Sequence, residues 1–188
     1  MLDHDIAKIK ASKEEIIIAN EQLEKEFTCK SETFSGITEN TKDVKNTFSV
    51  AIPKQWKTNL FYDEVQSSIY FADTTKQLTQ TVLIDITQLS KKYQFDANFK
   101  KQLYKNDSLL NLKSITGKEF LYKENPSYFA ISKGKKGNFS YQILNIFIQQ
   151  NNNNSFHFKT EVFGDKEVNE RFCKAINLLK SITINELK

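Results

Sequence analysis

The sequence predicts an α+β fold in which helices flank an antiparallel β-sheet. Short segments with alternating apolar residues, typical of half-buried strands, fill much of the chain after residue 47. Two segments, one in the middle and one near the C-terminus, instead repeat apolar residues at helical spacing. A hydrophobic content of 39% over 188 residues is enough to close one core, so we expect a single folded domain.

The N-terminal part is predicted to hold one further helix, over residues 13–26. Ser12 and Glu15 have the spacing of a capping box, and apolar residues then recur near helical spacing. Residues 28–46 have few apolar positions and many Ser, Thr, Lys and Glu residues. This composition predicts an extended linker between the helix and the domain.

The folded domain is predicted to span residues 47–188, and residues 1–46 are expected to be separable from it. Period-two alternation and the intervening turn residues predict strands at 48–52, 68–72, 81–87, 115–122, 128–132, 139–149 and 156–163. Short polar connections at 133–138 and 151–154 join the last three strands, which predicts an antiparallel meander.

Two helices are predicted within the domain. Asp96 is placed to cap the first, whose apolar residues Phe95, Phe99 and Leu103 are spaced four apart. Gly164 and Asp165 mark the start of the second, which carries the apolar stripe Val168, Phe172, Ile176 and Leu179. This stripe predicts that the last helix covers one face of the sheet.

Charge and cysteine usage exclude several classes of function. The 27 basic residues exceed the 23 acidic ones by only 4, and Arg171 is the single arginine, so the bidentate groups that read nucleic acid are almost absent. Cys29 and Cys173, with His4 and His157, form no local ligand spacing, and we expect neither a metal nor a cofactor. The cysteines are interpreted as a linker thiol and a buried thiol, with a disulfide as the alternative if the protein is exported.

No segment approaches the ~20 apolar residues of a membrane span, so the chain as written is expected to be soluble. Its N-terminus lacks the basic and apolar regions of a signal peptide. A cytoplasmic location and an exported one both remain open. In the second case a lipoprotein signal, absent from this sequence, would tether the N-terminus to a membrane.

Catalytic motifs are absent: the sequence has no nucleophile elbow, dinucleotide fingerprint or Walker A loop. His157 shares a predicted outward face with Lys159 and Glu161, which predicts an exposed surface histidine. Asp85 lies within an apolar strand, where pairing with a lysine or a polar edge is the favoured interpretation. A small hydrolase with a site assembled from Asp85, His157 and Cys173 is the alternative to a protein without catalysis.

Lysines gather at the predicted turn between two strands of the meander. Lys133, Lys135 and Lys136 give this turn a positive potential and are candidate contacts for an anionic partner. Lysines at such a turn more often serve solubility alone.

The strand from Phe48 ends at Pro53, and Trp56 follows three residues later. Strands, a helix, a meander and a terminal helix come next, and this order over residues 47–184 resembles the PsbP-like superfamily. That superfamily includes the PsbP extrinsic proteins of photosystem II, the DcrB-type bacterial lipoproteins and a yeast Ran-binding import factor. The resemblance implies an α/β/α sandwich, with Pro53 and Trp56 in its structural pattern and no functional residue carried over.

The expected function is therefore that of a non-enzymatic binding or assembly module, in a bacterial PsbP/DcrB-like protein. The resemblance implies that the partner is another protein, or an apolar segment of one. Nucleic acid is not expected as a partner.

Overall fold

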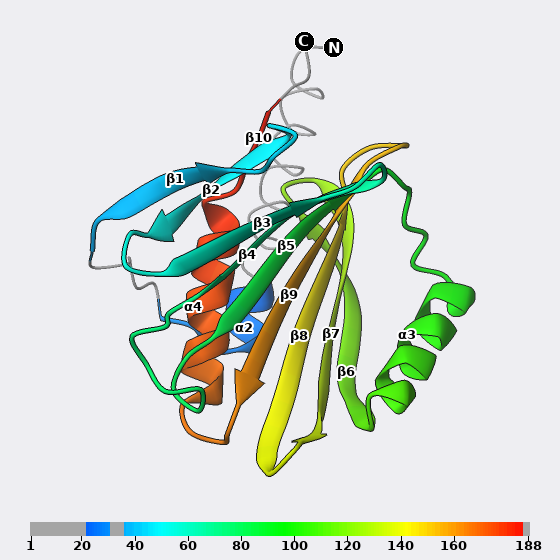
Figure 1. The fold of residues 1–188 in the computed structure, drawn as a ribbon. Helices are drawn as coiled ribbons and strands as arrows, with labels where there is room; N and C mark the ends of the chain where they lie inside the picture. The colour runs from blue at the N-terminus through cyan, green and yellow to red at the C-terminus, as the bar shows by residue number, and fades with distance from the viewer. Residues whose placement is uncertain (1–21, 31–35, 186–188) are drawn as a thin grey trace, which may run out of the picture.

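The computed structural model of the protein describes residues 22–30 and 36–185. A seven-stranded sheet, in which every neighbouring pair is antiparallel, has the strand order β3-β4-β5-β9-β8-β7-β6 (Figure 1). Its strands are β3 (Lys57–Tyr62), β4 (Gln66–Ala72), β5 (Leu83–Leu89), β6 (Leu112–Tyr122), β7 (Asn125–Lys136), β8 (Phe139–Gln149) and β9 (Ser155–Phe163).

A second, three-stranded sheet has β2 (Phe48–Pro53) at its centre, between β1 (Thr38–Lys42) and β10 (Thr183–Ile184). The helices are α2 (Gln22–Glu26), α3 (Ala97–Leu109) and α4 (Val168–Lys180). The α+β class, the antiparallel sheet and the final meander are confirmed. Among the described residues no helix is long and apolar enough to cross a membrane.

The main core lies on the face of the large sheet that α4 covers (Figure 1). Phe172, Ile176 and Leu179 of the predicted stripe are buried there against inward-facing strand residues such as Ile84 and Phe158. The helix begins later than predicted, at Val168. The stripe explains why α4 packs on this face, because its apolar residues recur along one side of the helix.

The opposite face of the large sheet is partly covered by α3. Asp96 caps this helix as predicted, accepting a hydrogen bond of 2.9 Å from the Phe99 backbone N–H. A second apolar cluster lies beneath the helix and the segment before it: Tyr93, Phe95, Phe99 and Leu103 pack on Tyr128, Ala130 and Phe147 of the sheet.

The prediction of an extended linker over residues 28–46 was wrong for residues 38–42, which form β1. All five side chains of β1 are polar, so no apolar alternation marks the strand. Its pairing with β2 supplies the backbone hydrogen bonds instead. Of the helix predicted over 13–26, residues 22–26 are helical, and the remainder lies outside the described residues.

Residues 22–30 of the N-terminal segment are joined to the core, and the expectation that residues 1–46 are separable stays a prediction. Leu23 and Phe27 are buried in the main core, where the Phe27 ring lies 5.5 Å from that of Phe172. Cys29 forms a disulfide with Cys173 of α4. The interpretation of the two cysteines as separate free thiols was therefore wrong, and the alternative of a disulfide is what the structure shows.

Candidate functional site

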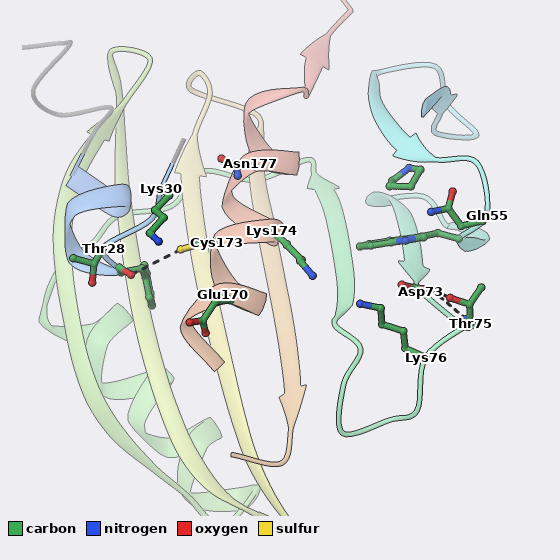
Figure 2. A pocket seen from close by; sticks show the side chains of 13 residues that line it. Thr28, Lys30, Gln55, Asp73, Thr75, Lys76, Glu170, Cys173, Lys174 and Asn177 are labelled. Atoms are coloured by element: carbon green, nitrogen blue, oxygen red, sulfur yellow. Dashed lines mark hydrogen bonds between the residues drawn. The ribbon is translucent and has the colours of Figure 1, made fainter. Parts of the chain in front are cut away.

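A groove of about 560 Å³ lies along the solvent side of α4, and we call it the α4 groove (Figure 2). Segments far apart in the sequence form its three walls, which are α4, the end of α2 with the residues after it, and the pair of loops that follow β2 and β4. The lining residues are Phe27, Thr28, Lys30, Pro53, Gln55, Trp56, Asp73, Thr75, Lys76, Glu170, Cys173, Lys174 and Asn177.

The α4 wall follows from helical geometry. Glu170, Cys173, Lys174 and Asn177 are three, four and seven residues apart, so they lie on one side of the helix. The apolar stripe occupies the other side and faces the sheet. Packing of the stripe therefore fixes which polar side chains face the groove.

The opposite wall begins where β2 ends. The backbone N–H of Trp56 donates a hydrogen bond of 2.9 Å to the Pro53 carbonyl, which closes a tight turn after the strand. Trp56 is 9% exposed and its ring lies 6.0 Å from that of Phe71, so its side chain packs in the core. The turn thereby places one aromatic residue, anchored in the core, at the edge of the α4 groove.

Lysines dominate the charge of the α4 groove. Lys30 and Lys76 are exposed and Lys174 is half-buried, and none of the three forms an ion pair with another described residue. Figure 2 shows Lys174 from α4 and Lys76 from the loop after β4 extending into the space between these two walls. Such an arrangement attracts anionic groups.

The two carboxylates of the groove differ in how far they can offset these lysines. Asp73 is buried, and its Oδ1 atom accepts hydrogen bonds from the Thr75 backbone N–H at 3.1 Å and from the Thr75 hydroxyl at 2.5 Å. Its charge is thus directed into its own loop. Glu170 is exposed on α4. Because the three lysines of the lining exceed its two carboxylates, the groove keeps an excess of positive charge.

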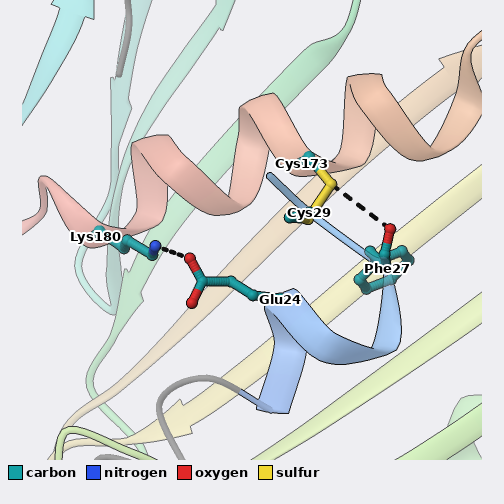
Figure 3. The surroundings of a disulfide bond; sticks show 5 residues. All are labelled: Glu24, Phe27, Cys29, Cys173 and Lys180. Atoms are coloured by element: carbon teal, nitrogen blue, oxygen red, sulfur yellow. Dashed lines mark hydrogen bonds and ion pairs between the residues drawn. A yellow bond between two sulfur atoms is a disulfide. The ribbon is translucent and has the colours of Figure 1, made fainter. Parts of the chain in front are cut away.

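The disulfide between Cys29 and Cys173 links the residues after α2 to α4 (Figure 3). Its Cα atoms are 5.4 Å apart. An ion pair between Glu24 of α2 and Lys180, at the C-terminal end of α4, joins the two helices a second time. These bonds hold the segment that carries Thr28 and Lys30 against α4. The N-terminal segment is therefore a wall of the groove.

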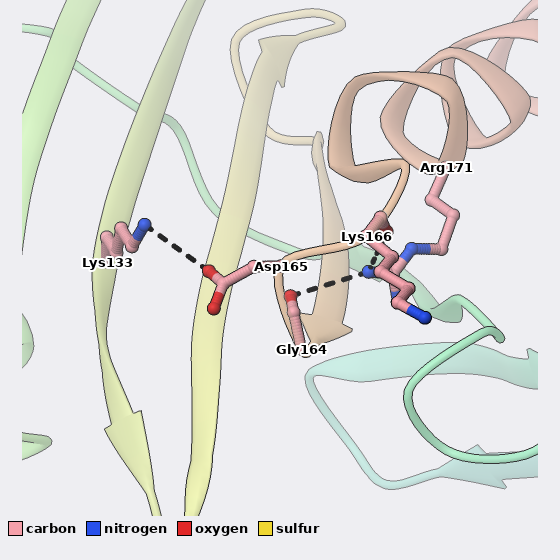
Figure 4. A network of polar contacts seen from close by, with 5 residues as sticks. All are labelled: Lys133, Gly164, Asp165, Lys166 and Arg171. Carbon is pink, nitrogen blue, oxygen red and sulfur yellow. Dashed lines mark hydrogen bonds and ion pairs between the residues drawn. The ribbon is translucent and has the colours of Figure 1, made fainter.

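Arg171 fixes the first turn of α4 from inside the protein (Figure 4). It is 2% exposed, and its guanidinium donates to four backbone carbonyls: those of Thr81 at 3.1 Å, Phe163 at 2.8 Å, Gly164 at 3.4 Å and Lys166 at 2.6 Å. Arg171 thus serves the fold, and its position holds α4 in place beside the groove.

The residues of the hydrolase alternative are not brought together. Cys173 lies on the α4 side of the sheet and is bound in the disulfide. Asp85 and His157 lie on the opposite face, because Ile84, Ile86, Phe156 and Phe158 alternate with them and point into the main core. The described residues also contain no group of three or more side chains suited to hold a metal ion.

His157 is half-buried, not exposed as its neighbours in sequence predict. Its ring stacks on that of Phe147 at 4.4 Å, and its Nε2 atom lies 2.8 Å from Oδ1 of Asn145. Burial, with contributions from Lys159 and Lys91, lowers the pKa of His157 to about 3. The imidazole is therefore neutral at physiological pH and contributes to packing.

Asp85 has hydrogen-bonding partners on the same face. Its Oδ1 atom accepts a bond of 3.1 Å from the Thr87 hydroxyl, and burial raises the pKa of the carboxyl. Lys159 lies directly opposite on β9, where it forms an ion pair of 2.6 Å with Glu161. Asp85 thus lies among polar side chains on a central strand of the sheet, and among the described residues neither an ion pair with a lysine nor a position at the sheet edge is found for it.

The three lysines predicted as candidate partner contacts lie near the β7–β8 hairpin, away from the α4 groove. Strand β7 extends to Lys136, so the connection predicted over 133–138 is a turn of two residues. Lys133 lies 3.5 Å from Asp165 (Figure 4) and Lys136 lies 4.0 Å from Glu161. Of the three, Lys135 is the one without an ion pair to another described residue.

Sequence reasoning did not find the α4 groove. Pro53, Trp56 and Cys173 were singled out from the sequence and do line it. The lysines gave no signal, because Lys30, Lys76 and Lys174 are far apart along the chain and none stands in a motif. Only the packing of α4 between the two walls brings them together.

Comparisons with known proteins identify a fold and no relative in sequence. No protein-family model matches this chain. No curated protein matches it at a level that would indicate a relative.

Solved structures do resemble it. Cyanobacterial PsbP (CyanoP) from Synechocystis sp. PCC 6803 has a TM-score of 0.54 and 10% identity, over 84% of this chain and 97% of that chain. A mutant of the protein Mog1 has a TM-score of 0.51 and 7% identity, over 78% of this chain and 95% of that chain. The expected PsbP-like fold is confirmed by these likenesses.

Proposed function

We propose that this PsbP-like fold serves as a non-enzymatic binding module that holds an acidic segment of another protein in the α4 groove. The observation that carries the proposal is the set of three lysines, from three walls, with no ion pair to a described residue. Carboxylates of a bound segment would complete these ion pairs. Apolar side chains of the segment would pack against Trp56.

A protein segment fits this groove better than a compact cofactor does. Sites for small molecules are usually lined by apolar and aromatic side chains with a few convergent polar groups. The α4 groove has the opposite balance, since charged and amide side chains outnumber its aromatic ones. The sequence had suggested an apolar segment as the partner, and the lysines favour an acidic one.

The absence of catalysis is part of the proposal. Its support is the separation of Asp85 and His157 from Cys173 by the thickness of the sheet, and the use of Cys173 in the disulfide. The alternative hydrolase would need these side chains in one cleft.

An oxidising compartment is the second part of the proposal. Disulfides persist in the periplasm or outside the cell and are rare in the cytosol. The bond between Cys29 and Cys173 therefore supports an exported protein.

The binding proposal can be tested with peptides selected for the α4 groove. A phage-displayed library of random peptides is enriched on the full chain, and the recovered peptides are synthesised and titrated. Trp56 is the only tryptophan, so its fluorescence reports occupancy of the groove directly. We expect enriched peptides to combine Asp or Glu with an aromatic residue.

Two variants of equal charge change locate the binding site. The double variant Lys76→Glu/Lys174→Glu should raise the peptide Kd about tenfold or more, because two attractive pairs become repulsive. The matched variant Lys133→Glu/Lys135→Glu on the hairpin should leave Kd within about twofold. Selected peptides without acidic residues, or a larger loss from the hairpin variant, would contradict the proposal.

A further inference from the structure

Strand β3 forms one edge of the large sheet, and no described residue pairs with its outer side (Figure 1). Its apolar side chains are unusually exposed: Leu60 is 42%, Phe61 58% and Tyr62 65% accessible. An uncovered edge with exposed apolar residues is a template for pairing with another strand.

The other edge strand, β6, carries protection that β3 lacks. Its register shifts between Ser114 and Thr116, and charged residues such as Lys118 and Glu119 lie along it. Helix α3 packs beside it. These features discourage pairing, whereas β3 has five uncharged residues in succession after Lys57.

The hairpin at the end of β3 shows which backbone groups are free to pair. The backbone N–H of Asp63 donates a hydrogen bond of 3.0 Å to the Gln66 carbonyl, so the backbone groups of Asp63 face β4. Because this orientation alternates along a strand, the N–H and C=O groups of Thr58, Leu60 and Tyr62 point away from β4. These three residues present the open edge.

We propose that this edge pairs with the same edge of a second copy of the chain, antiparallel, with Leu60 opposite Leu60. The two Leu60 residues would then exchange backbone hydrogen bonds, and each Thr58 would do so with the partner's Tyr62. The large sheets of the two copies become one continuous sheet. The interface is isologous, as in most homodimers.

Charge selects this register over its neighbours. Directly opposed residues lie on the same face of a sheet, so the centre of symmetry falls on a residue, and Asn59, Leu60 and Phe61 are the candidates. With Leu60 at the centre, each Lys57 stands opposite an Asp63 of the other copy. Centres at Asn59 or Phe61 would place Lys57 opposite Phe61 or Val65 instead.

The same charge complementarity indicates that the partner of this edge is a second copy of the chain. The edge carries a cation at one end, an anion at the other and uncharged residues between them, which is self-complementary in the antiparallel sense. Asp63 is exposed, and only its Oδ1 atom takes part in the described hydrogen bonds, with the N–H groups of Val65 and Gln66. Its second oxygen faces no described donor.

A cysteine at the symmetry centre tests the register. In the variant Leu60→Cys the two opposed Cα atoms would be about 5.5 Å apart, within the range of a disulfide. In the control Phe61→Cys each cysteine stands opposite Asn59, and the two cysteines are offset along the strands to about 8 Å, beyond that range. Both variants are incubated in a glutathione redox buffer and separated on non-reducing gels.

We expect a disulfide-linked dimer from Leu60→Cys at least tenfold faster than from Phe61→Cys. In sedimentation velocity, the unmodified chain should show a dimer fraction that rises with concentration. The variant Lys57→Glu should lower that fraction, because it places an acidic residue opposite Asp63 of the other copy. Equal or absent cross-linking in the two cysteine variants, or a wild-type chain that stays monomeric at every concentration, would overturn the proposal.

Discussion

Arg171 shows how one side chain can hold the wall of the α4 groove without facing it. Its guanidinium donates to carbonyls from three places in the chain: before β5, at the end of β9, and in the turn before α4. Hydrogen bonds from a charged donor contribute more than neutral ones. The single arginine of the sequence is thereby used inside the protein, which leaves lysines as the cations of the α4 groove.

His157 shows the limit of sequence alternation at the scale of one residue. The pattern correctly turns its side chain away from the main core, to the face opposite Phe156 and Phe158. It does not reveal that the chain before α3 returns over this face, where Tyr93 packs on Phe147. A residue on the second face of a sheet is buried or exposed according to what covers it, and that depends on distant segments.

The burial of His157 predicts a dependence of stability on pH. Its pKa is about 3 in the folded protein and about 6.5 when unfolded, so the unfolded state binds the proton more readily. The stability that this difference provides is complete above pH 6.5 and is lost as the pH falls. From pH 7 to pH 5, the wild type should lose up to about 2 kcal/mol more than His157→Gln.

Urea unfolding of both proteins at pH 5, 6, 7 and 8 measures this difference. Because the raised pKa of Asp85 acts in the opposite direction in both proteins, the difference between them isolates the histidine. A gap between wild type and variant that stays constant over this pH range would mean that His157 is exposed to protonation in the folded state.

Among the elements, the N-terminal segment departs most from the expectation drawn from its sequence. Leu23 and Phe27 gave only a thin apolar stripe, and the polar residues after them suggested a linker. The structure secures the segment through two buried side chains, one disulfide and the pairing of β1 with β2. Cysteine pairing and strand pairing are long-range, so local composition does not predict them.

The disulfide should make a large contribution to stability. Cys29 and Cys173 are separated by 144 residues, and closing so long a loop restricts the unfolded chain. The double variant Cys29→Ser/Cys173→Ser should lose about 2 to 5 kcal/mol of unfolding free energy. Chemical denaturation with and without dithiothreitol provides the control, since reductant should bring the wild type to the level of the variant and leave the variant unchanged.

A stability loss below about 1 kcal/mol would indicate that the N-terminal segment is not fastened to α4 by this bond. The earlier expectation that the domain folds without residues 1–46 would then regain support.

The predictable strands and helices share a physical reason. Strands β2, β5 and β8 and helix α4 bury apolar side chains on a defined face, and burial leaves a period in the sequence. Strand β3 was missed because most of its residues are exposed on both faces, so that no alternation marks it. Edges and grooves are therefore what the sequence conveys least, and they are also where partners bind.

At the scale of the whole molecule, the two proposed binding surfaces are formed by different parts of the fold. The α4 groove lies where α4 meets the N-terminal segment and the loops after β2 and β4, and it offers positive charge. The β3 edge offers backbone hydrogen bonds. Dimerisation through β3 would leave each copy with its own groove, so that one assembly presents two.

A zero-length cross-link shows whether an acidic segment lies among the lysines of the α4 groove. Carbodiimide joins a carboxylate to an amine only when the two are in contact. A selected acidic peptide is coupled to the full chain, and the product is mapped by mass spectrometry. We expect cross-links at Lys76 and Lys174, with Lys30 as the third site; cross-links confined to Lys133, Lys135 and Lys136 would contradict binding in the α4 groove.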